Sequence, residues 1–161
     1  MIRAAIVGDP NKVPQYILAK IPQFEWACRT SMARIVIGLQ IKIVKEKLTG
    51  QVLKTQTGRL RRSISASMSP AGPIVTGIVG TNVEYAAIHE FGGKTGAHQI
   101  LPKRGKALAF NWKGKDVVFA KVNHPGSIMP ERSFMRTALN EMKPQILQEF
   151  QNAIFEVIGK A

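Results

Sequence analysis

The chain has 161 residues, of which 45% are hydrophobic, and its formal net charge is +13 at pH 7. This length allows one domain with a buried core, and the apolar share is ordinary for a soluble globular protein. The excess of positive charge is not ordinary and indicates either a polyanionic partner or a shared compartment where the repulsion between copies is offset. Cys28 is the only cysteine, which excludes an intrachain disulfide and a cysteine-based zinc site and favours a reducing compartment.

Residues 1–23 predict an irregular N-terminal leader or arm, because three prolines break them: Pro10, Pro14 and Pro22. At most one short helix, near residues 15–21, fits this stretch. The apolar run at its start is too short for a signal peptide, and the longest later run, residues 35–39, cannot span a bilayer. We therefore expect no membrane partner, and a single α+β domain over residues 24–161.

Residues 24–49 predict a long helix, because their apolar residues recur at helical spacing. A strand competes with this interpretation, because five apolar residues alternate strictly: Ile35, Ile37, Leu39, Ile41 and Ile43. The helix is favoured by the length of the segment, by Gly50 as a stop, and by lysines in the last turns, which suit the negative end of a helix. A second apolar face is expected to meet another subunit or the C-terminal helix: Ile37, Ile41, Val44 and Leu48.

Residues 51–122 predict antiparallel strands, which we place at 62–67, 74–79, 107–112 and 116–122. The glycine of Lys113-Gly114-Lys115 indicates a hairpin between the last two strands. A short helix is predicted over residues 85–91, where Gly92 and Gly93 end it. The glycines and Pro102 of residues 92–105 indicate a long mobile loop.

Residues 133–158 predict a closing helix that Ser133 caps and that Pro144 kinks. The predicted elements together give an α+β fold. In it, a long N-terminal helix and a C-terminal helix pack on a mainly antiparallel four-stranded sheet with a long mobile loop.

No group of residues indicates catalysis, a metal or a cofactor. His89, His98 and His124 are separated by 9 and 26 residues, so no two of them share a helical face. No second histidine follows His89-Glu90 at the spacing of a zinc-protease helix. No serine lies in a nucleophile elbow, and no glycine-rich phosphate-binding motif is present. The sequence therefore predicts a protein without enzymatic activity, cofactor or metal.

Positive charge is concentrated in two windows, 42–62 and 94–121, each with seven basic residues against one acidic residue. On a flexible loop such as residues 103–106, long cationic side chains follow a phosphate backbone without reading bases. Phe110 and Trp112 are expected to fill the core rather than to stack on single-stranded bases. The prediction is sequence-blind attraction to duplex DNA, and solvated surface charge is the simpler alternative. The candidate residues facing a DNA channel are Lys54, Arg59, Arg61, Arg62, Lys103, Arg104, Lys106, Lys113 and Lys115.

Three blocks of sequence carry a family resemblance. They are TGRLRRSI at 57–64, GTNVEYA at 80–86 followed by HEFG at 89–92, and PERSFMRTAL at 130–139. In order and spacing they resemble the tail-completion proteins of long-tailed bacteriophages, which are also called neck, minor tail or head–tail joining proteins. Ser133 departs from the pattern, because the family often places a proline just before the Phe of the last block.

The resemblance implies a structural virion protein that is made in the host cytoplasm and located at the head–tail junction. Such subunits are expected to form a homo-oligomeric ring of six copies. The ring joins the tail terminator or tail tube protein to the head connector or stopper protein, and it surrounds the channel through which the double-stranded genomic DNA passes. The loop at 92–105 lines this channel or hooks onto an adjacent ring. The matched blocks offer these residues for assembly or for the core: Gly58, Tyr85, Phe91, Gly92, Pro130, Arg132, Phe134 and Arg136.

The aromatic and arginine residues of these blocks also have roles that follow from their chemistry. Tyr85, Phe91 and Phe134 are expected to be core anchors, because buried aromatic side chains remove a large apolar area from water. Arg132 and Arg136 flank Phe134 and are expected to pair with a nearby carboxylate, either Glu84 or Glu90.

A second function, from another class, fits the same charge distribution. It is a monomeric or dimeric, sequence-nonspecific nucleic-acid-binding accessory protein, such as a packaging factor. Ring formation with tail or connector components favours the first function. Steep salt dependence of DNA binding by the isolated protein favours the second.

Overall fold

The computed structural model describes residues 12–71, 74–103 and 105–159. The chain divides into two compact units. Unit 1 comprises Met1–Val83 and Phe134–Ala161, and unit 2 comprises Glu84–Ser133. The predicted α+β class is confirmed, with long helices in the N-terminal and C-terminal regions and antiparallel strands between them.

Unit 1 is built around helix α1, Lys12–Lys42, which continues into the π-helical segment η1, Ile43–Gln51. The helix is therefore confirmed over the competing strand. Gly50, with a φ of 127°, leaves helical geometry at the predicted stop. The alternating apolar residues did not produce a strand here, because the helical spacing of apolar residues extends over the whole long segment, and the helix continues through Gly38.

The start of α1 corrects the prediction of an irregular leader over residues 1–23, because the helix already begins at Lys12. Residues 1–11 of that leader lie outside the described residues. Pro14 is tolerated because the first four N–H groups of a helix have no intrahelical acceptor. Pro22 removes one backbone hydrogen bond, and the 31-residue helix continues through it.

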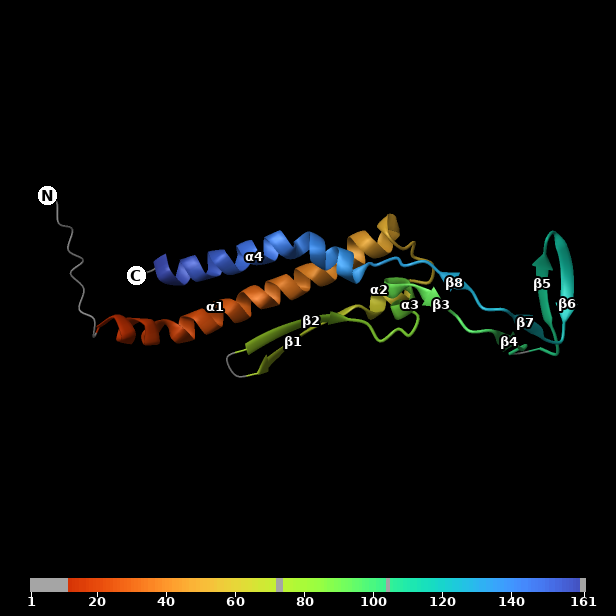
Figure 1. The fold of residues 1–161 in the computed structure, drawn as a ribbon, viewed down its shortest axis with the longest axis horizontal. Helices are drawn as coiled ribbons and strands as arrows, with labels where there is room; N and C mark the ends of the chain where they lie inside the picture. Colours follow the sequence, from red (N-terminus) through yellow and green to blue (C-terminus); the bar gives the residue numbers. More distant parts are fainter. Residues whose placement is uncertain (1–11, 72–73, 104, 160–161) are drawn as a thin grey trace. The chain divides into compact units, whose positions relative to one another are not determined.

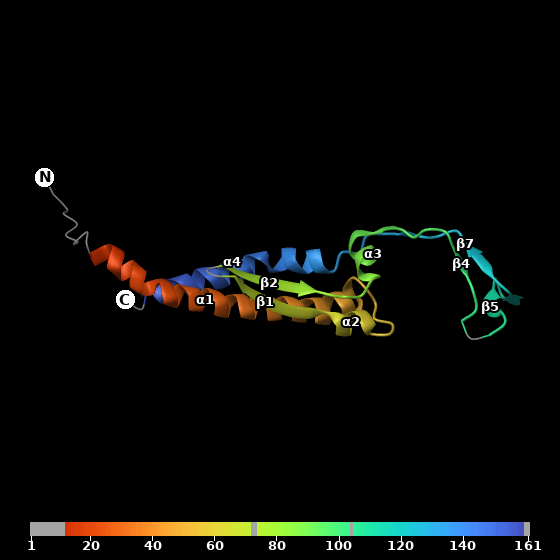
Figure 2. The same cartoon turned by 90° about the horizontal axis from the view of Figure 1, so that it is seen from below.

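Helix α4, Met135–Gly159, runs antiparallel to α1 and lies along it in both views (Figures 1 and 2). Three contacts mark this alignment from one end to the other. Nζ of Lys20 donates to the carbonyl oxygen of Val157 at 3.4 Å, Arg34 pairs with Glu149 at 3.2 Å, and Lys47 pairs with Glu141 at 2.6 Å. The helix continues through Pro144.

The hairpin of β1, Ser65–Ala71, and β2, Ile74–Gly80, lies on another side of α1 than α4 does (Figure 1). Its strands are antiparallel in the register Ser65↔Gly80. The hairpin approaches α1 closely at Gly77, where an added Cβ would lie 2.3 Å from Cγ2 of Val36. A larger residue at this point would displace the side chains of Val36 and Met32.

The strand predicted at 62–67 is wrong in its first half. Arg59–Ser63 form the short helix α2, and β1 begins only at Ser65. The arginines and Leu60 are good helix formers, and Gly58 starts the turn that precedes them. The core of unit 1 lies between these elements. Its buried apolar residues are Ala27, Val36, Ile43, Leu48, Leu53, Ile64, Val83, Phe134, Ala138, Met142 and Val157.

Unit 2 begins with the short helix α3, Ala86–Phe91, which confirms the helix predicted at 85–91. Three antiparallel strand pairs follow. They are β3, Gly93–Lys94, with β8, Ile128–Met129; β4, His98–Ile100, with β7, Val122–His124; and β5, Leu108–Trp112, with β6, Lys115–Phe119.

The strand pairing differs from the expected single four-stranded sheet. Among the described residues, the strands form four separate two-stranded ladders. The loop predicted at 92–105 contains β3 and β4, and Arg104 in it lies outside the described residues. Alternation of apolar and polar residues predicts that a segment is a strand, but it does not show which strands pair with each other. Strands of two or three residues are too short for a periodic signal.

Candidate nucleic-acid interface

The arginine-rich turn of unit 1 is positioned by Thr57 and Gly58. Gly58 has a φ of 71°, in the left-handed region that glycine adopts readily. The hydroxyl oxygen of Thr57 accepts a hydrogen bond from the backbone N–H of Arg59 at 3.4 Å. The N–H of Arg62 donates to the carbonyl oxygen of Gly58 at 3.0 Å. The chain therefore turns at Gly58 and presents Arg59, Arg61 and Arg62 on one turn of helix.

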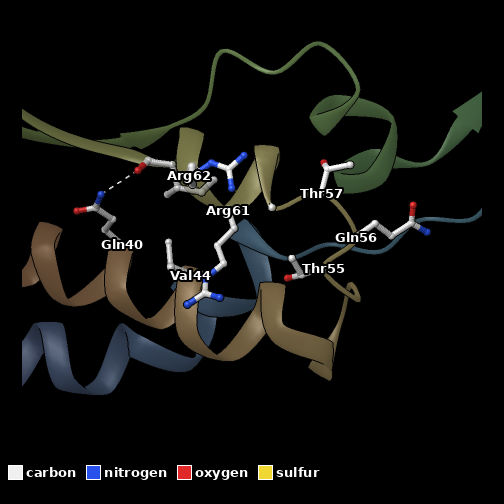
Figure 3. Close-up of a pocket in the computed structure, with 9 residues that line it drawn as sticks. Gln40, Val44, Thr55, Gln56, Thr57, Arg61 and Arg62 are labelled. Atoms are coloured by element: carbon white, nitrogen blue, oxygen red, sulfur yellow. Dashed lines mark hydrogen bonds between the residues drawn. The ribbon is translucent and has the colours of Figure 1, made fainter.

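The base of this turn is held by neighbouring parts of unit 1. The side-chain amide of Gln40 donates to the carbonyl oxygen of Ile64 at 2.8 Å (Figure 3). The hydroxyl groups of Ser63 and Thr81 are 2.6 Å apart and share a hydrogen bond. Helix α2 is thus fastened to α1 on one side and to the end of β2 on the other.

An open pocket of about 590 Å³ lies beside this turn. Figure 3 shows Arg61 reaching toward the helix that carries Val44. The guanidinium of Arg62 lies against Gly58, where an added Cβ would be 2.9 Å from its Nη1. The residues lining the pocket are Gln40, Val44, Thr55, Gln56, Thr57, Gly58, Arg61, Arg62 and Ile64. Guanidinium, amide and hydroxyl donors around an open hollow are suited to phosphate oxygens.

The second basic cluster lies in unit 2 on and beside the β5–β6 hairpin. Lys113 and Gly114 have φ values of 50° and 82° and form the two-residue turn, so the predicted hairpin is confirmed. Asn111 supports this turn, because its Oδ1 accepts from the N–H of Gly114 at 3.0 Å. The exposed lysines of this cluster are Lys103, Lys106, Lys113, Lys115 and Lys121.

The DNA-facing candidates are therefore divided between the two units. Lys54, Arg59, Arg61 and Arg62 lie in unit 1, and all four are exposed. Lys103, Lys106, Lys113 and Lys115 lie in unit 2 and are also exposed. Arg104 lies outside the described residues.

The second and third sequence blocks meet inside unit 2. The backbone N–H of Arg132 donates to the carbonyl oxygen of His89 at 2.8 Å, and the hydroxyl of Ser133 donates to Oε1 of Glu90 at 2.7 Å. Glu90 is buried, with 5% of its surface exposed. At Gly92, whose φ is 68°, an added Cβ would lie 2.8 Å from the backbone nitrogen of Glu131. These contacts explain why the two blocks require a glycine after helix α3.

The burial of the aromatic motif residues corrects several predictions. Phe134 is completely buried, whereas Tyr85 is 39% exposed and Phe91 is 68% exposed. Phe110 and Trp112, which were expected to fill the core, are 37% and 61% exposed. An apolar side chain in the sequence fits a protomer core and an intermolecular contact equally well, so composition could not separate the two.

A buried lysine is the feature that the sequence analysis missed. Lys47 is 1% exposed, and its Nζ donates to Oε1 of Glu141 at 2.6 Å. Lys42 reaches the other carboxylate oxygen of Glu141 at 3.1 Å and pairs with Glu46 at 2.7 Å. Hydrogen bonds from Lys47 and Lys42 hold the pKa of Glu141 below its usual value. Hydrogen bonds to Glu46 and Glu141 raise the pKa of Lys42.

Two of the three histidines lie together, although their sequence spacing did not suggest it. His98 and His124 are cross-strand partners in β4 and β7, and their rings stack with centroids 5.1 Å apart. Within the described ranges, no three side chains capable of binding a metal gather in one place. Of the helices in those ranges, none has the length and apolar character that crossing a bilayer requires.

Comparison with known proteins identifies the family. Residues 38–159, more than half of the chain, match the model of the phage virion morphogenesis family. The match spans the buried ion pair of unit 1, both basic clusters and all three sequence blocks. Neither the curated proteins nor the solved structures that were searched gave a significant match. The chain belongs to the phage virion morphogenesis family, which gives it a role in building the phage particle.

Proposed function

We propose that this chain is a structural protein of the head–tail junction, where six copies form a ring that joins the tail to the head. Its partners in this proposal are the tail terminator or tail tube protein and the head connector or stopper protein. The double-stranded genome passes through the ring. Membership of a virion morphogenesis family supports a structural role rather than an enzymatic one.

The observation that carries the assembly role is the exposure of large apolar side chains on the helices of unit 1. Ile37 and Ile41, one turn apart on α1, are 54% and 47% exposed. On α4, Leu147 and Phe155 are 65% and 69% exposed. Exposed apolar surface of this kind marks sites of protein–protein contact. Of the second apolar face predicted for the N-terminal helix, Ile37 and Ile41 are thus available to another subunit, whereas Leu48 is buried in the core of the protomer.

The two exposed basic clusters support passage of DNA. Their long cationic side chains attract phosphate groups through charge, and this attraction is independent of the base sequence. A channel through which a genome slides requires this kind of contact. The same clusters support the alternative of a packaging factor that binds DNA on its own, and the experiment below separates the two.

Electron microscopy of particles from a phage that lacks this chain tests the proposal. We expect filled heads and complete tails that accumulate separately, and joined particles when the chain is supplied from a plasmid. Empty heads would instead support the packaging factor. Joined particles in the absence of the chain would refute both.

The ring itself is tested with the purified protein by analytical ultracentrifugation, alone and bound to tails. Ile37→Ser is expected to weaken self-association, because it removes an exposed apolar contact from α1. The matched control is Glu25→Ser, which changes an exposed polar position on the same helix. Equal self-association of the two variants would show that this face of α1 does not form the subunit contact.

A further inference from the structure

The β5–β6 hairpin of unit 2 has one face that is almost entirely apolar. Cross-strand partners in an antiparallel pair share a face, and successive residues alternate between faces. The register Leu108↔Phe119, Phe110↔Val117 and Trp112↔Lys115 therefore places these six side chains on one side. The other side carries Ala109, Asn111, Asp116 and Val118.

This aromatic face is open to solvent. Trp112 is 61% exposed, Phe119 is 47% exposed and Phe110 is 37% exposed. Among the described residues, β5 and β6 pair only with each other. A two-stranded hairpin is marginally stable alone in water, and exposed clustered aromatic residues are typical of binding hot spots. The hairpin therefore has the properties of an element that is completed by a partner.

The surroundings of the aromatic face are strongly basic. Five exposed lysines lie on the hairpin or in the segments next to it: Lys103, Lys106, Lys113, Lys115 and Lys121. Asp116 is the acidic residue of the hairpin, and its Oδ1 accepts a hydrogen bond from the side-chain amide of Asn111 at 2.9 Å. The partner surface that complements this hairpin is apolar at its centre and acidic at its rim.

We propose that the aromatic face of the β5–β6 hairpin docks into an apolar groove with an acidic rim on a different protein of the phage particle. A second copy of this chain fits poorly, because its formal charge of +13 would face the lysines with like charge. That the partner is a component of the particle rests on the proposed function. The docking face itself rests on the geometry and charge of the hairpin.

Single-stranded nucleic acid is the competing occupant, because exposed aromatic residues beside lysines also stack on bases. The ring arrangement argues against it. Phe110 meets Trp112 edge to face, at 84° with centroids 6.5 Å apart, and lies 6.0 Å from Phe119. The rings contact one another rather than standing open as separate stacking platforms. Val117 continues the apolar surface between the aromatic side chains, and such a continuous surface suits a protein groove.

The first experiment compares two variants in complementation of a phage that lacks the chain. Trp112→Ser removes the most exposed aromatic residue of the docking face. Val118→Ser is the matched control, because Val118 is 68% exposed on the opposite face of the same hairpin. We expect Trp112→Ser to reduce phage yield by at least about tenfold relative to Val118→Ser. Loss of one hot-spot residue weakens binding to a partner by about this factor or more. Equal yields from similar amounts of folded protein would overturn the proposal.

The acidic rim is tested by reversing the charge of Lys113 and Lys115 together. The variant Lys113→Glu with Lys115→Glu is expected to reduce yield as Trp112→Ser does, and also to weaken the crosslink from position 112 to the partner protein, which loss of attraction to DNA alone would not do. An unchanged yield would overturn the charge complementarity. The two proposals fail separately. Joined heads and tails in a phage that lacks the chain would refute the head–tail function, whereas loss of growth with Trp112→Ser would still support the docking face.

The occupant is identified by photocrosslinking during infection, with benzoylphenylalanine in place of Trp112 or, as the control, Val118. We expect position 112, and not 118, to crosslink to one other protein of the particle, at a site lined by apolar and acidic residues. Crosslinks to a second copy or to DNA, or none that are specific to position 112, would overturn the proposal. Binding of oligo(dT) by the purified protein that is lost in Trp112→Ser would likewise assign the face to single-stranded nucleic acid.

Discussion

Replacement of the buried Lys47 by methionine is expected to leave the protein as stable as before, or more stable. The ammonium group lies in a site with 1% exposure, and it makes a 2.6 Å hydrogen bond to Glu141. Lys47→Met keeps most of the aliphatic stem and therefore opens little space. It removes a charge-assisted hydrogen bond that contributes about 1.5–3 kcal/mol, but it also removes a desolvation cost of several kcal/mol.

The balance of these two terms sets the expected magnitude. Replacement of a whole buried ion pair by apolar residues is neutral, or raises the free energy of unfolding by about 1–4 kcal/mol. Here Lys47 is the buried member of the pair and Glu141 is 42% exposed, so removal of the lysine alone leaves no buried charge behind. No charge is left without a partner, because Glu141 keeps its 3.1 Å contact with Lys42. Urea unfolding followed by far-UV circular dichroism measures the change, and a constant slope with urea shows that the transition itself is unaltered.

Glu141→Gln is the opposing variant, and it is expected to lower stability. It leaves the Lys47 ammonium in its buried site beside a neutral amide, and an uncompensated buried charge is strongly destabilising. In the double variant the buried charge is gone, so Glu141→Gln should then cost much less than it does alone. The reasoning would be refuted if Lys47→Met lowered the free energy of unfolding more than Glu141→Gln, or if the two changes were additive.

Three further predictions concern pH, the core and the backbone. The pKa of Glu141 is lowered from 4.5 in the folded protein, so its carboxylate stabilises the fold above that value, and this stabilisation is lost as the pH falls through the folded pKa. In acid unfolding, Glu141→Gln should therefore lose less of its free energy of unfolding than the wild type does. Phe134→Ala should lower the free energy of unfolding by about 3–5 kcal/mol, because Phe134 is completely buried. Phe155→Ala, at a position 69% exposed on α4, should change it by less than about 0.5 kcal/mol. Similar losses for the two variants in urea unfolding would contradict the assigned core. Gly126→Ala should open unit 2 locally, because the φ of 89° is strained for alanine and the new Cβ would lie 2.1 Å from the backbone oxygen of Thr95. Hydrogen exchange of the amides near Thr95 and Gly126 measures the effect, and unchanged protection of these amides would contradict it.

Local signals in the sequence were sufficient for the elements that depend on neighbouring residues. Gly50 ended the first helix at its predicted position, and Lys113-Gly114 formed the predicted hairpin turn. In both cases the chemistry of one glycine and its neighbours determines the backbone. The beginning of α1 was set too late, because Pro14 and Pro22 were interpreted as breaks although a helix tolerates one in its first turn and can absorb the other.

Features that depend on distant residues could not be predicted in this way. Glu141 is 94 residues from Lys47 in the chain, and nothing near Lys47 signals that it is buried. From the sequence, Lys47 was assigned only to the last turns of a predicted helix, where a positive charge suits the negative end of the helix. The pairing of β3 with β8 likewise joins residues that are far apart in sequence, and neither two-residue strand has a periodic pattern.

The wrongly assigned aromatic residues connect the fold to the proposed function. Phe91, Phe110 and Trp112 were placed in the core because aromatic residues bury a large apolar area, and that energetic argument holds wherever the burial takes place. In the isolated chain these side chains remain exposed, and among the described residues more large apolar side chains are exposed than buried. A protein that completes its apolar contacts only with partners has this distribution, whereas a self-sufficient monomer rarely does. The same sequence pattern that misleads a prediction of the protomer core is therefore evidence for assembly.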